Sequence, residues 1–227
     1  MTQSDFIAKL FNPDDLILLR IIETWAEEGK KRSRVLQTRY AQANQVVAIL
    51  SEPEMFEAAK IGNTFFGVCP RKGDKGQFDL ACQIAKVSCL WADLDNCSPS
   101  DSTKRVLEEG LPTPSIVVSS GNGTHFYWVL SQSIEIAGAL LFPIESNSAK
   151  GKTIGILGIG ENDPEYSKLT ALCPQAKEFK SRLAGIASRI GGDATTDLSR
   201  LLRMPGTMNR KGHRNGDKPT KCEVVSC

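Results

Sequence analysis

One strand places the tightest constraint on what this sequence can fold into. Residues 86–94 form an apolar run that carries Asp93 and is followed at once by Asp95. Successive side chains of a strand point to opposite faces, so the two aspartates share a face and lie close together. There both carboxylates can reach one divalent cation. The alternative for an isolated pair is a solvated strand end with Asp95 capping the next helix, so the neighbouring segments decide between the two.

A glycine-rich turn follows in the chain. Residues 115–119 and 125–130 are predicted strands, and Ser120-Gly121-Asn122-Gly123 between them is typical of a tight hairpin. The glycines let the backbone approach a ligand closely. His125 opens the second strand, where its imidazole could donate to a phosphate oxygen. The alternative is an ordinary hairpin with a half-buried histidine.

A third segment adds a carboxylate and a group of cations. Asp197 is followed by Arg200 and Arg203, a spacing suited to contacts with phosphates or bases. Residues 198–221 hold a single acid, Asp217, among seven basic residues, which favours a polyanion as partner over a merely solvated face. The basic residues are Arg200, Arg203, Arg210, Lys211, Arg214, Lys218 and Lys221.

The remaining pattern predicts alternating helices and strands without repeats or linkers, so we expect one compact α+β unit. Residues 131–174 allow no prediction. Helices are predicted at 12–29, 52–60, 98–109 and 175–190, a helical turn at 198–203, and strands at 35–40, 64–69 and 221–225.

Composition excludes several classes of protein. With 227 residues, 41% of them hydrophobic and 24% charged, the chain can form an ordinary globular core, and its net charge of +2 by itself favours no partner. Seven cysteines without a CxxC pair indicate a reducing, cytoplasmic location. They are expected as buried free thiols, with zinc on some of Cys69, Cys82, Cys89 and Cys97 as the alternative. Prolines and glycines interrupt the uncharged stretch 110–134, so neither a transmembrane helix nor a membrane partner is expected.

Together, four segments resemble the archaeo-eukaryotic primase (AEP) superfamily, in particular the primase-polymerases of plasmids, phages and other mobile elements. The segments are Phe66 to Arg71, Leu90 to Asp95, Ser120 to His125 and Asp197 to Asn209. The resemblance implies a single α+β catalytic domain with an RRM-like antiparallel or mixed sheet flanked by helices. Residues 1–62 would form an N-terminal α/β subdomain that completes the core formed by residues 63–227. We expect the chain to lack the C-terminal helical or helicase domain of many relatives.

The resemblance also implies roles for individual residues. Asp93, Asp95 and Asp197 match the ligands of two divalent metals, Mg²⁺ or Mn²⁺, and His125 matches the histidine that contacts the incoming triphosphate. Nucleotide binding is further expected of Arg71, Ser120, Gly121, Gly123, Arg200, Arg203, Asn209 and Lys211. The glycines stand where some members carry Ser and Lys, so backbone amides are expected to replace those side chains. Template contacts are expected of Lys30, Lys31, Arg32, Arg34, Arg210 and Arg214, with a solvated loop as the alternative for residues 30–34.

The implied function is template-dependent nucleotidyl transfer by a DNA primase and DNA polymerase. Its partners would be a single-stranded DNA template, a primer and nucleoside triphosphates, and a replicative helicase or C-terminal primase domain. A metal-dependent nuclease could use the same carboxylates, but paired arginines favour a triphosphate site. A noncatalytic RRM-like module could stack bases on Phe66, Phe126, Tyr127 and Trp128, but three acids would repel its nucleic acid.

Overall fold

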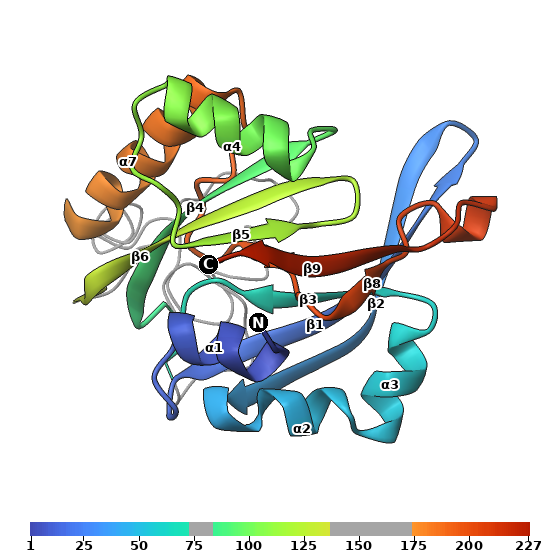
Figure 1. The fold of residues 1–227 in the computed structure, drawn as a ribbon. Helices are drawn as coiled ribbons and strands as arrows, with labels where there is room; N and C mark the ends of the chain where they lie inside the picture. Colours follow the sequence, from blue (N-terminus) through green and yellow to red (C-terminus); the bar gives the residue numbers. More distant parts are fainter. Residues whose placement is uncertain (73–83, 137–173) are drawn as a thin grey trace, which may run out of the picture.

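The structure is a computed structural model that describes residues 1–72, 84–136 and 174–227 (Figure 1). Nine strands and a few helices make up the described part of the chain. The strands are β1 (Leu16–Glu27), β2 (Lys30–Gln42), β3 (Asn63–Gly67), β4 (Lys86–Asp95), β5 (Ile116–Ser119), β6 (Gly123–Glu135), β7 (Leu201–Arg203), β8 (Thr207–Asn209) and β9 (Thr220–Ser226). The helices are α1 (Gln3–Leu10), α2 (Val46–Leu50), α3 (Pro53–Ala59), α4 (Pro99–Glu108) and α7 (Pro174–Ile190), with short 3₁₀ turns η1 (Ala43–Gln45) and η4 (His213–Asn215).

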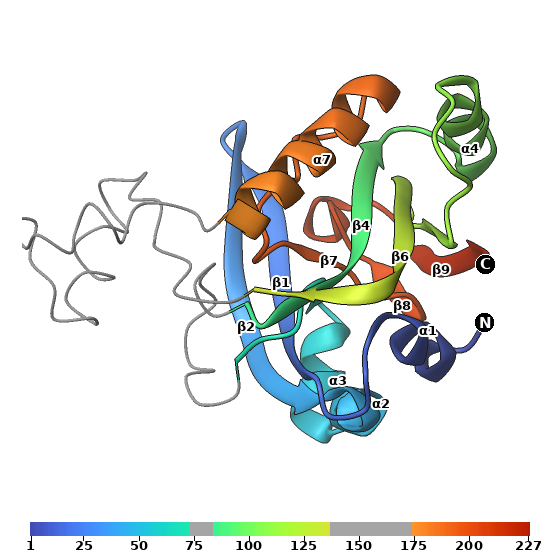
Figure 2. The same cartoon turned by 90° about the vertical axis from the view of Figure 1, so that its left-hand side faces the viewer.

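The strands form two antiparallel sheets. A four-stranded sheet has the order β2-β1-β3-β7, and a five-stranded sheet has the order β4-β6-β5-β9-β8. The short segment between β7 and β8 carries the chain from one sheet to the other. Helices α2 and α3 lie beside the first sheet, whereas α4 and α7 lie beside the second (Figures 1 and 2). The α+β class and the antiparallel, helix-flanked sheet expected from the sequence are confirmed.

Aromatic side chains join the two sheets around α1. The ring of Phe6 packs edge-on against Phe66 of β3 and Tyr127 of β6, with ring centroids 5.4 Å and 5.5 Å away. All three rings are buried in the main core cluster. A smaller cluster packs on the opposite face of β4, where Ala92 and Leu94 point away from that core. Because side chains alternate along β4, Asp93 and Asp95 lie on the face of Trp91, which is also the face of the main core.

Two sequence predictions were wrong. Residues 12–29 were expected to be helical, but most of them form β1, which pairs with β2 through a tight turn at Glu28 and Gly29. Both turn residues have positive φ, as the favoured two-residue hairpin turns require. Residues 198–203 were expected to form a helical turn, but β7 pairs with β3 there, Phe65 opposite Arg203. In both segments long-range pairing overrides a local helical pattern.

The other predicted elements are confirmed, but β2 begins five residues earlier than expected, so residues 30–34 belong to a strand and not to a loop, and β6 ends five residues later than expected. The confirmed elements are the strands at 35–40, 64–69, 86–94, 115–119, 125–130 and 221–225 and the helices at 52–60, 98–109 and 175–190. The side chain of Ser98 caps α4 by accepting the Asp101 N–H, so the capping role considered for Asp95 belongs to Ser98. Among the described residues, no helix combines the length and apolar character needed to cross a membrane.

The cysteine expectations are resolved only in part. Cys69, Cys89 and Cys222 are buried free thiols, and Cys97 is a partly buried one. Cys82 and Cys173 lie outside the described residues. Within the described ranges, no three His, Cys, Asp or Glu side chains surround a common point where a metal ion could be held.

Candidate active site

The carboxylate pair lies where β4 and β6 run side by side. In the antiparallel register Asp93 is opposite His125, and Asp95 is opposite Gly123. Directly opposed residues project from the same face, and His125 Nε2 lies 3.5 Å from Asp93 Oδ1. The imidazole is only 2% exposed and the Asp93 carboxylate 21%. The sheet thus brings together two of the predicted site segments, with Asp95 open to solvent at the strand end.

The glycines of the hairpin turn are required by packing. A Cβ at Gly123 would lie 2.1 Å from the Leu94 carbonyl oxygen, and one at Gly121 would lie 2.3 Å from Thr220 Oγ1. The Ser120 N–H closes the turn by donating to the Gly123 carbonyl oxygen at 2.9 Å. The turn therefore holds β6 tightly against the end of β4. Phosphate contacts by Ser120, Gly121 and Gly123 stay a prediction.

Replacing Gly123 should disturb the packing of β6 against the end of β4. We expect Gly123→Ala to lower the free energy of unfolding by roughly 2–4 kcal/mol, because the clash is with backbone that cannot rotate away. Thermal and urea denaturation followed by circular dichroism measure this. Gly185→Ala, in α7, is the control, since no described atom lies within 4 Å of its added Cβ. It should raise stability by up to about 1 kcal/mol, and an equally mild Gly123→Ala would contradict the packing argument.

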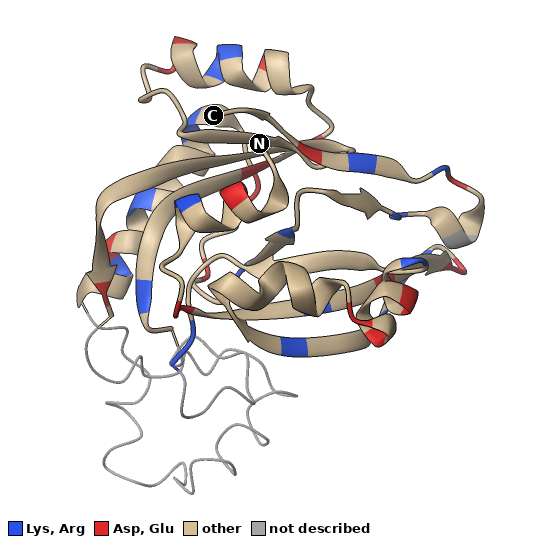
Figure 3. Ribbon diagram, turned by 60° about the horizontal axis from the view of Figure 1, so that its bottom comes forward, with Lys and Arg blue, Asp and Glu red and all other residues tan. Residues whose placement is uncertain are grey.

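Cations surround the carboxylate pair. Burial, and then the charge of Asp95, raises the pKa of Asp93 to about 6, while Arg203, Arg200 and Lys211 act in the opposite direction. The Arg203 guanidinium lies 5.7 Å from the centre of the Phe65 ring. Its pKa is lowered by burial, against the charges of Cys222, Asp93 and Asp95. Over the rest of the described ribbon, basic and acidic residues are interspersed (Figure 3). Acids and cations from three separate segments, β4, residues 200–203 and Lys211, thus meet at this site.

His125 is neutral in this environment. Burial lowers its pKa to about 3, and the nearby Arg203 acts in the same direction. Its Nδ1 lies 3.5 Å from the Tyr127 hydroxyl, on the side away from Asp93. The imidazole is therefore fixed between two polar groups and can serve as a neutral hydrogen-bonding group rather than as a cation.

Asp193, to which the sequence analysis gave no role, is joined to Asp93 through the backbone. The Asp193 N–H donates to the Asp93 carbonyl oxygen at 2.8 Å. Burial raises the pKa of Asp193, and the charges of Asp93 and Asp95 raise it further. The sequence signal was present, because Asp193 begins the same segment as Asp197, but spacing alone does not say which of the two acids turns toward β4.

Asp197, the predicted third acid, lies in different surroundings. Its Oδ2 accepts from Arg200 Nη2 at 2.9 Å, and half of its side chain is exposed. Burial raises the pKa of the Cys69 thiol and the charge of Asp197 raises it further, whereas Asp197 is not among the charges that act on the pKa of Asp93 or Asp193. The structure therefore brings Asp197 to Arg200 rather than to the carboxylate pair.

Two predicted nucleotide-binding residues are buried and bound to backbone. Arg71 donates to the carbonyl oxygens of Cys69 and Ser199, which ties the end of β3 to the loop before β7. Asn209 donates to the Ser120 carbonyl oxygen at 2.9 Å, and its own oxygen accepts the Lys211 N–H at 3.0 Å. Both side chains hold the segments that carry the site, and direct contact with a nucleotide stays a prediction for each.

The predicted template-binding residues are spread over several surfaces. Arg210 Nε donates to the Ala59 carbonyl oxygen at 2.8 Å, beside the end of α3. Arg34 and Arg32 pair with Glu23 and Glu27 on the β1–β2 hairpin. Lys31 faces a pocket that is described below. The side chain of Arg214 lies outside the described residues.

Comparison with known proteins identifies the fold. No family model matches the chain, and no curated protein matches it. Among solved structures, the AEP domain of the cyanophage S-2L primase-polymerase is similar over 98% of this chain and 86% of its own, with 16% identity and a TM-score of 0.54. The primase RepB' is 13% identical at a TM-score of 0.47, and this chain spans 56% of it. The catalytic domain of RepB', solved with initiator DNA, is 12% identical at a TM-score of 0.48, and 84% of that domain is covered. The chain therefore has the fold of an archaeo-eukaryotic primase-polymerase catalytic domain.

Proposed function

We propose that this protein is a template-dependent nucleotidyltransferase, a DNA primase-polymerase that starts or extends a primer on single-stranded DNA. The observation that carries the proposal is the Asp93 and Asp95 pair, which lies among Arg200, Arg203 and Lys211 on a primase-polymerase fold. Carboxylates alone would suit many metal-dependent enzymes. Cations beside them suit a substrate that brings several negative charges to the same place, as a nucleoside triphosphate does.

The acids fit divalent metal ions by their chemistry. Oxygen ligands are what Mg²⁺ and Mn²⁺ prefer. The pKa of Asp93 is raised by burial and then by the charge of Asp95, and a bound cation would offset both effects. We assign Asp93 and Asp95 as ligands and Asp193, whose pKa responds to the charges of both, as the candidate third carboxylate, and the phosphates of the substrate would complete the set. Bound there, two ions would activate a primer 3′-hydroxyl and stabilise the leaving pyrophosphate.

The remaining side chains bind and orient the substrate. Arg200 and Arg203 would neutralise the triphosphate and fix its position, which contributes to rate through orientation and electrostatics. Neutral His125, whose buried ring lies 3.5 Å from Asp93 Oδ1, would cover one side of that carboxylate. The partners are then a template strand, a primer and nucleoside triphosphates, with a helicase or helical primase domain as a further partner.

Incorporation of labelled nucleotides on single-stranded DNA tests the proposal, with and without a primer and in Mg²⁺ or Mn²⁺. Synthesis that follows the template sequence and is absent from Asp93→Ala is the expected result. Products made without a primer assign priming, and extension of a primer alone assigns polymerase activity. Shortening of the DNA would instead indicate a nuclease, and binding without any chemistry would indicate a noncatalytic module.

A further inference from the structure

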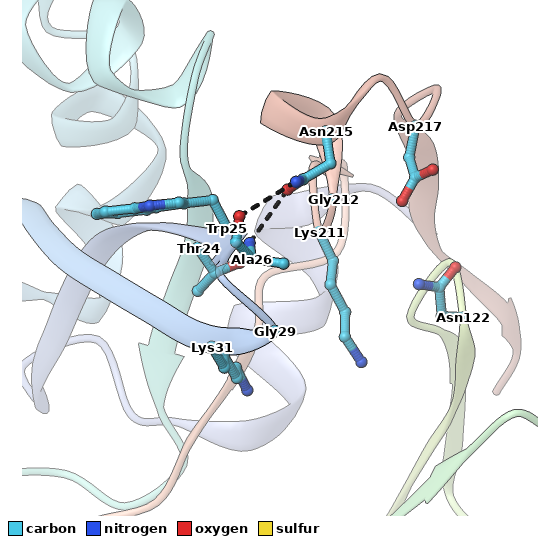
Figure 4. A pocket seen from close by; sticks show the side chains of 10 residues that line it. All are labelled: Thr24, Trp25, Ala26, Gly29, Lys31, Asn122, Lys211, Gly212, Asn215 and Asp217. Carbon is cyan, nitrogen blue, oxygen red and sulfur yellow. Dashed lines mark hydrogen bonds between the residues drawn. The ribbon is translucent and has the colours of Figure 1, made fainter.

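A pocket of about 470 Å³ is lined by Lys211, whose charge also acts on the pKa of Asp93. It lies between the β1–β2 hairpin on one side and residues 211–217 on the other (Figure 4). Asn122, from the turn that precedes His125, lines a third side. Arg200, Arg203 and His125 are not among the residues that line it. The pocket is therefore a separate space from the one around the triphosphate-binding arginines.

Only one residue of the basic run 30–34 faces this pocket. Arg32 is paired in register with Trp25 and Arg34 with Glu23, and Lys31 is paired with Ala26 on the opposite face. Arg32 Nε lies 3.3 Å from Glu27, and Arg34 Nε lies 2.6 Å from Glu23. Lys31 points into the pocket instead, as does Lys211 from across the gap (Figure 4).

A side-chain clamp fixes the hairpin at the edge of the pocket. Asn215 of η4 accepts the Ala26 N–H through Oδ1 at 3.1 Å and donates through Nδ2 to the Ala26 carbonyl oxygen at 3.2 Å. These two bonds join residues 189 positions apart in the chain. They set the distance between the strand that precedes Lys31 and the segment that carries Lys211 (Figure 4).

Asp93 and Asp95 do not line the pocket, but two observations connect its lining residues with them. The charge of Lys211 acts on the pKa of Asp93, so its ammonium group lies near that carboxylate. The carbonyl oxygen of Asn122 accepts the Asn96 N–H at 2.8 Å, directly after Asp95. These two links put Lys211 and the Asn122 turn, which line the pocket, close to the β4 end that carries the two aspartates.

We propose that this pocket holds the sugar-phosphate backbone of the nucleic-acid strand that enters the active site, with Lys31 and Lys211 on its phosphates. The assignment rests on the proposed function. Both lysines are exposed and come from separate elements, which suits the spaced charges of a strand. Asp217 also lines the pocket. Its carboxylate would repel the concentrated negative charge of a free triphosphate more strongly than the single, spaced charges of a strand, which favours the strand.

Binding of a fluorescently labelled oligothymidylate, measured by anisotropy in EDTA at several NaCl concentrations, tests this assignment. Lys31→Ala and Lys211→Ala should each weaken binding about three- to tenfold and reduce the salt slope by about 0.7, the value for one phosphate contact on a single strand. Arg32→Ala is the matched control, because it removes the same charge one residue away on the opposite face. It should change affinity by less than about twofold.

Three outcomes would overturn the assignment. Equal losses of oligonucleotide affinity in Lys31→Ala and Arg32→Ala would mean that binding depends on the net charge of the hairpin and not on the pocket. Unchanged oligonucleotide binding in both lysine variants would remove the strand from the pocket, even in a protein that incorporates nucleotides normally. Weaker binding of a fluorescent nucleoside triphosphate, with oligonucleotide binding intact, would reassign the pocket to the triphosphate. The oligonucleotide-binding assay contains neither metal nor nucleoside triphosphate. The expected losses of affinity in a protein without incorporation activity would therefore support the pocket and overturn only the proposed function.

Discussion

In metal-free buffer at pH 7.5, the free energy of unfolding of Asp93→Asn should exceed that of the wild-type protein by about 1–3 kcal/mol. Burial, and then the charge of Asp95, raises the pKa of Asp93 to about 6 in the folded protein, from the 3.8 that is usual for an aspartate in water. Above pH 6 the folded protein thus keeps a buried charge beside Asp95 that the unfolded chain exposes to water. Asparagine retains the shape and removes that charge.

The pH dependence of this difference has a definite sign. An acid whose pKa is raised by folding destabilises the folded state at high pH, and the penalty disappears as the acid becomes protonated in both states. The stability gained by Asp93→Asn should therefore be largest above pH 6 and vanish as the pH falls toward 4. Urea denaturation of both proteins at pH 4, 5, 6 and 7.5 measures it. A difference that grows toward low pH would contradict the assigned cause.

Metal ions give the same substitution a second readout. Millimolar Mn²⁺ should raise the midpoint of thermal unfolding of the wild-type protein and leave that of Asp93→Asn unchanged, because binding to the folded state alone stabilises it. Asp14→Asn, in the exposed turn before β1, is the control and should respond as the wild type does. Equal responses from all three proteins would remove Asp93 as a metal ligand.

Asp193→Ala should reduce nucleotide incorporation about 100- to 1,000-fold, whereas Asp197→Ala should reduce it less than about tenfold. The backbone of Asp193 is bonded to Asp93, and its carboxylate senses the charges of Asp93 and Asp95. Asp197 instead pairs with Arg200, so its loss should mainly raise KM for the nucleotide by freeing that arginine. Steady-state kinetics at varied nucleotide and Mg²⁺ concentrations separate the two effects. The reverse order of losses would restore Asp197 as the third acid.

The features that sequence reasoning predicted well are those with a local cause. Period-two alternation placed Asp93 and Asp95 on one face, and the structure adds that His125 is the direct cross-strand partner of Asp93. The hairpin from β5 to β6 followed from its glycines, because few residues other than glycine fit so close to the Leu94 carbonyl.

The features that it missed depend on partners distant in the chain. Residues 16–27 have apolar positions that suit a helix, yet they form β1 because β2 and β3 pair with them on both sides. Arg71 has the charge of a phosphate ligand, and only the folded structure shows it donating to backbone carbonyl oxygens in the interior. The choice between Asp193 and Asp197 has the same origin, since both acids precede the same arginines and only packing against β4 separates them.

The central claim is that Asp93 and Asp95 carry out nucleotidyl transfer. Its most direct test is pyrophosphate release during primer extension in Mg²⁺, with Asp95→Asn compared against Asp14→Asn. Asp95 is exposed at the strand end, so its substitution should leave the fold intact. We expect the wild type and Asp14→Asn to release one pyrophosphate for each nucleotide added. The rate of pyrophosphate release by Asp95→Asn should be lower by a factor of at least about 1,000. A folded Asp95→Asn protein that extends primers at the wild-type rate would contradict the claim.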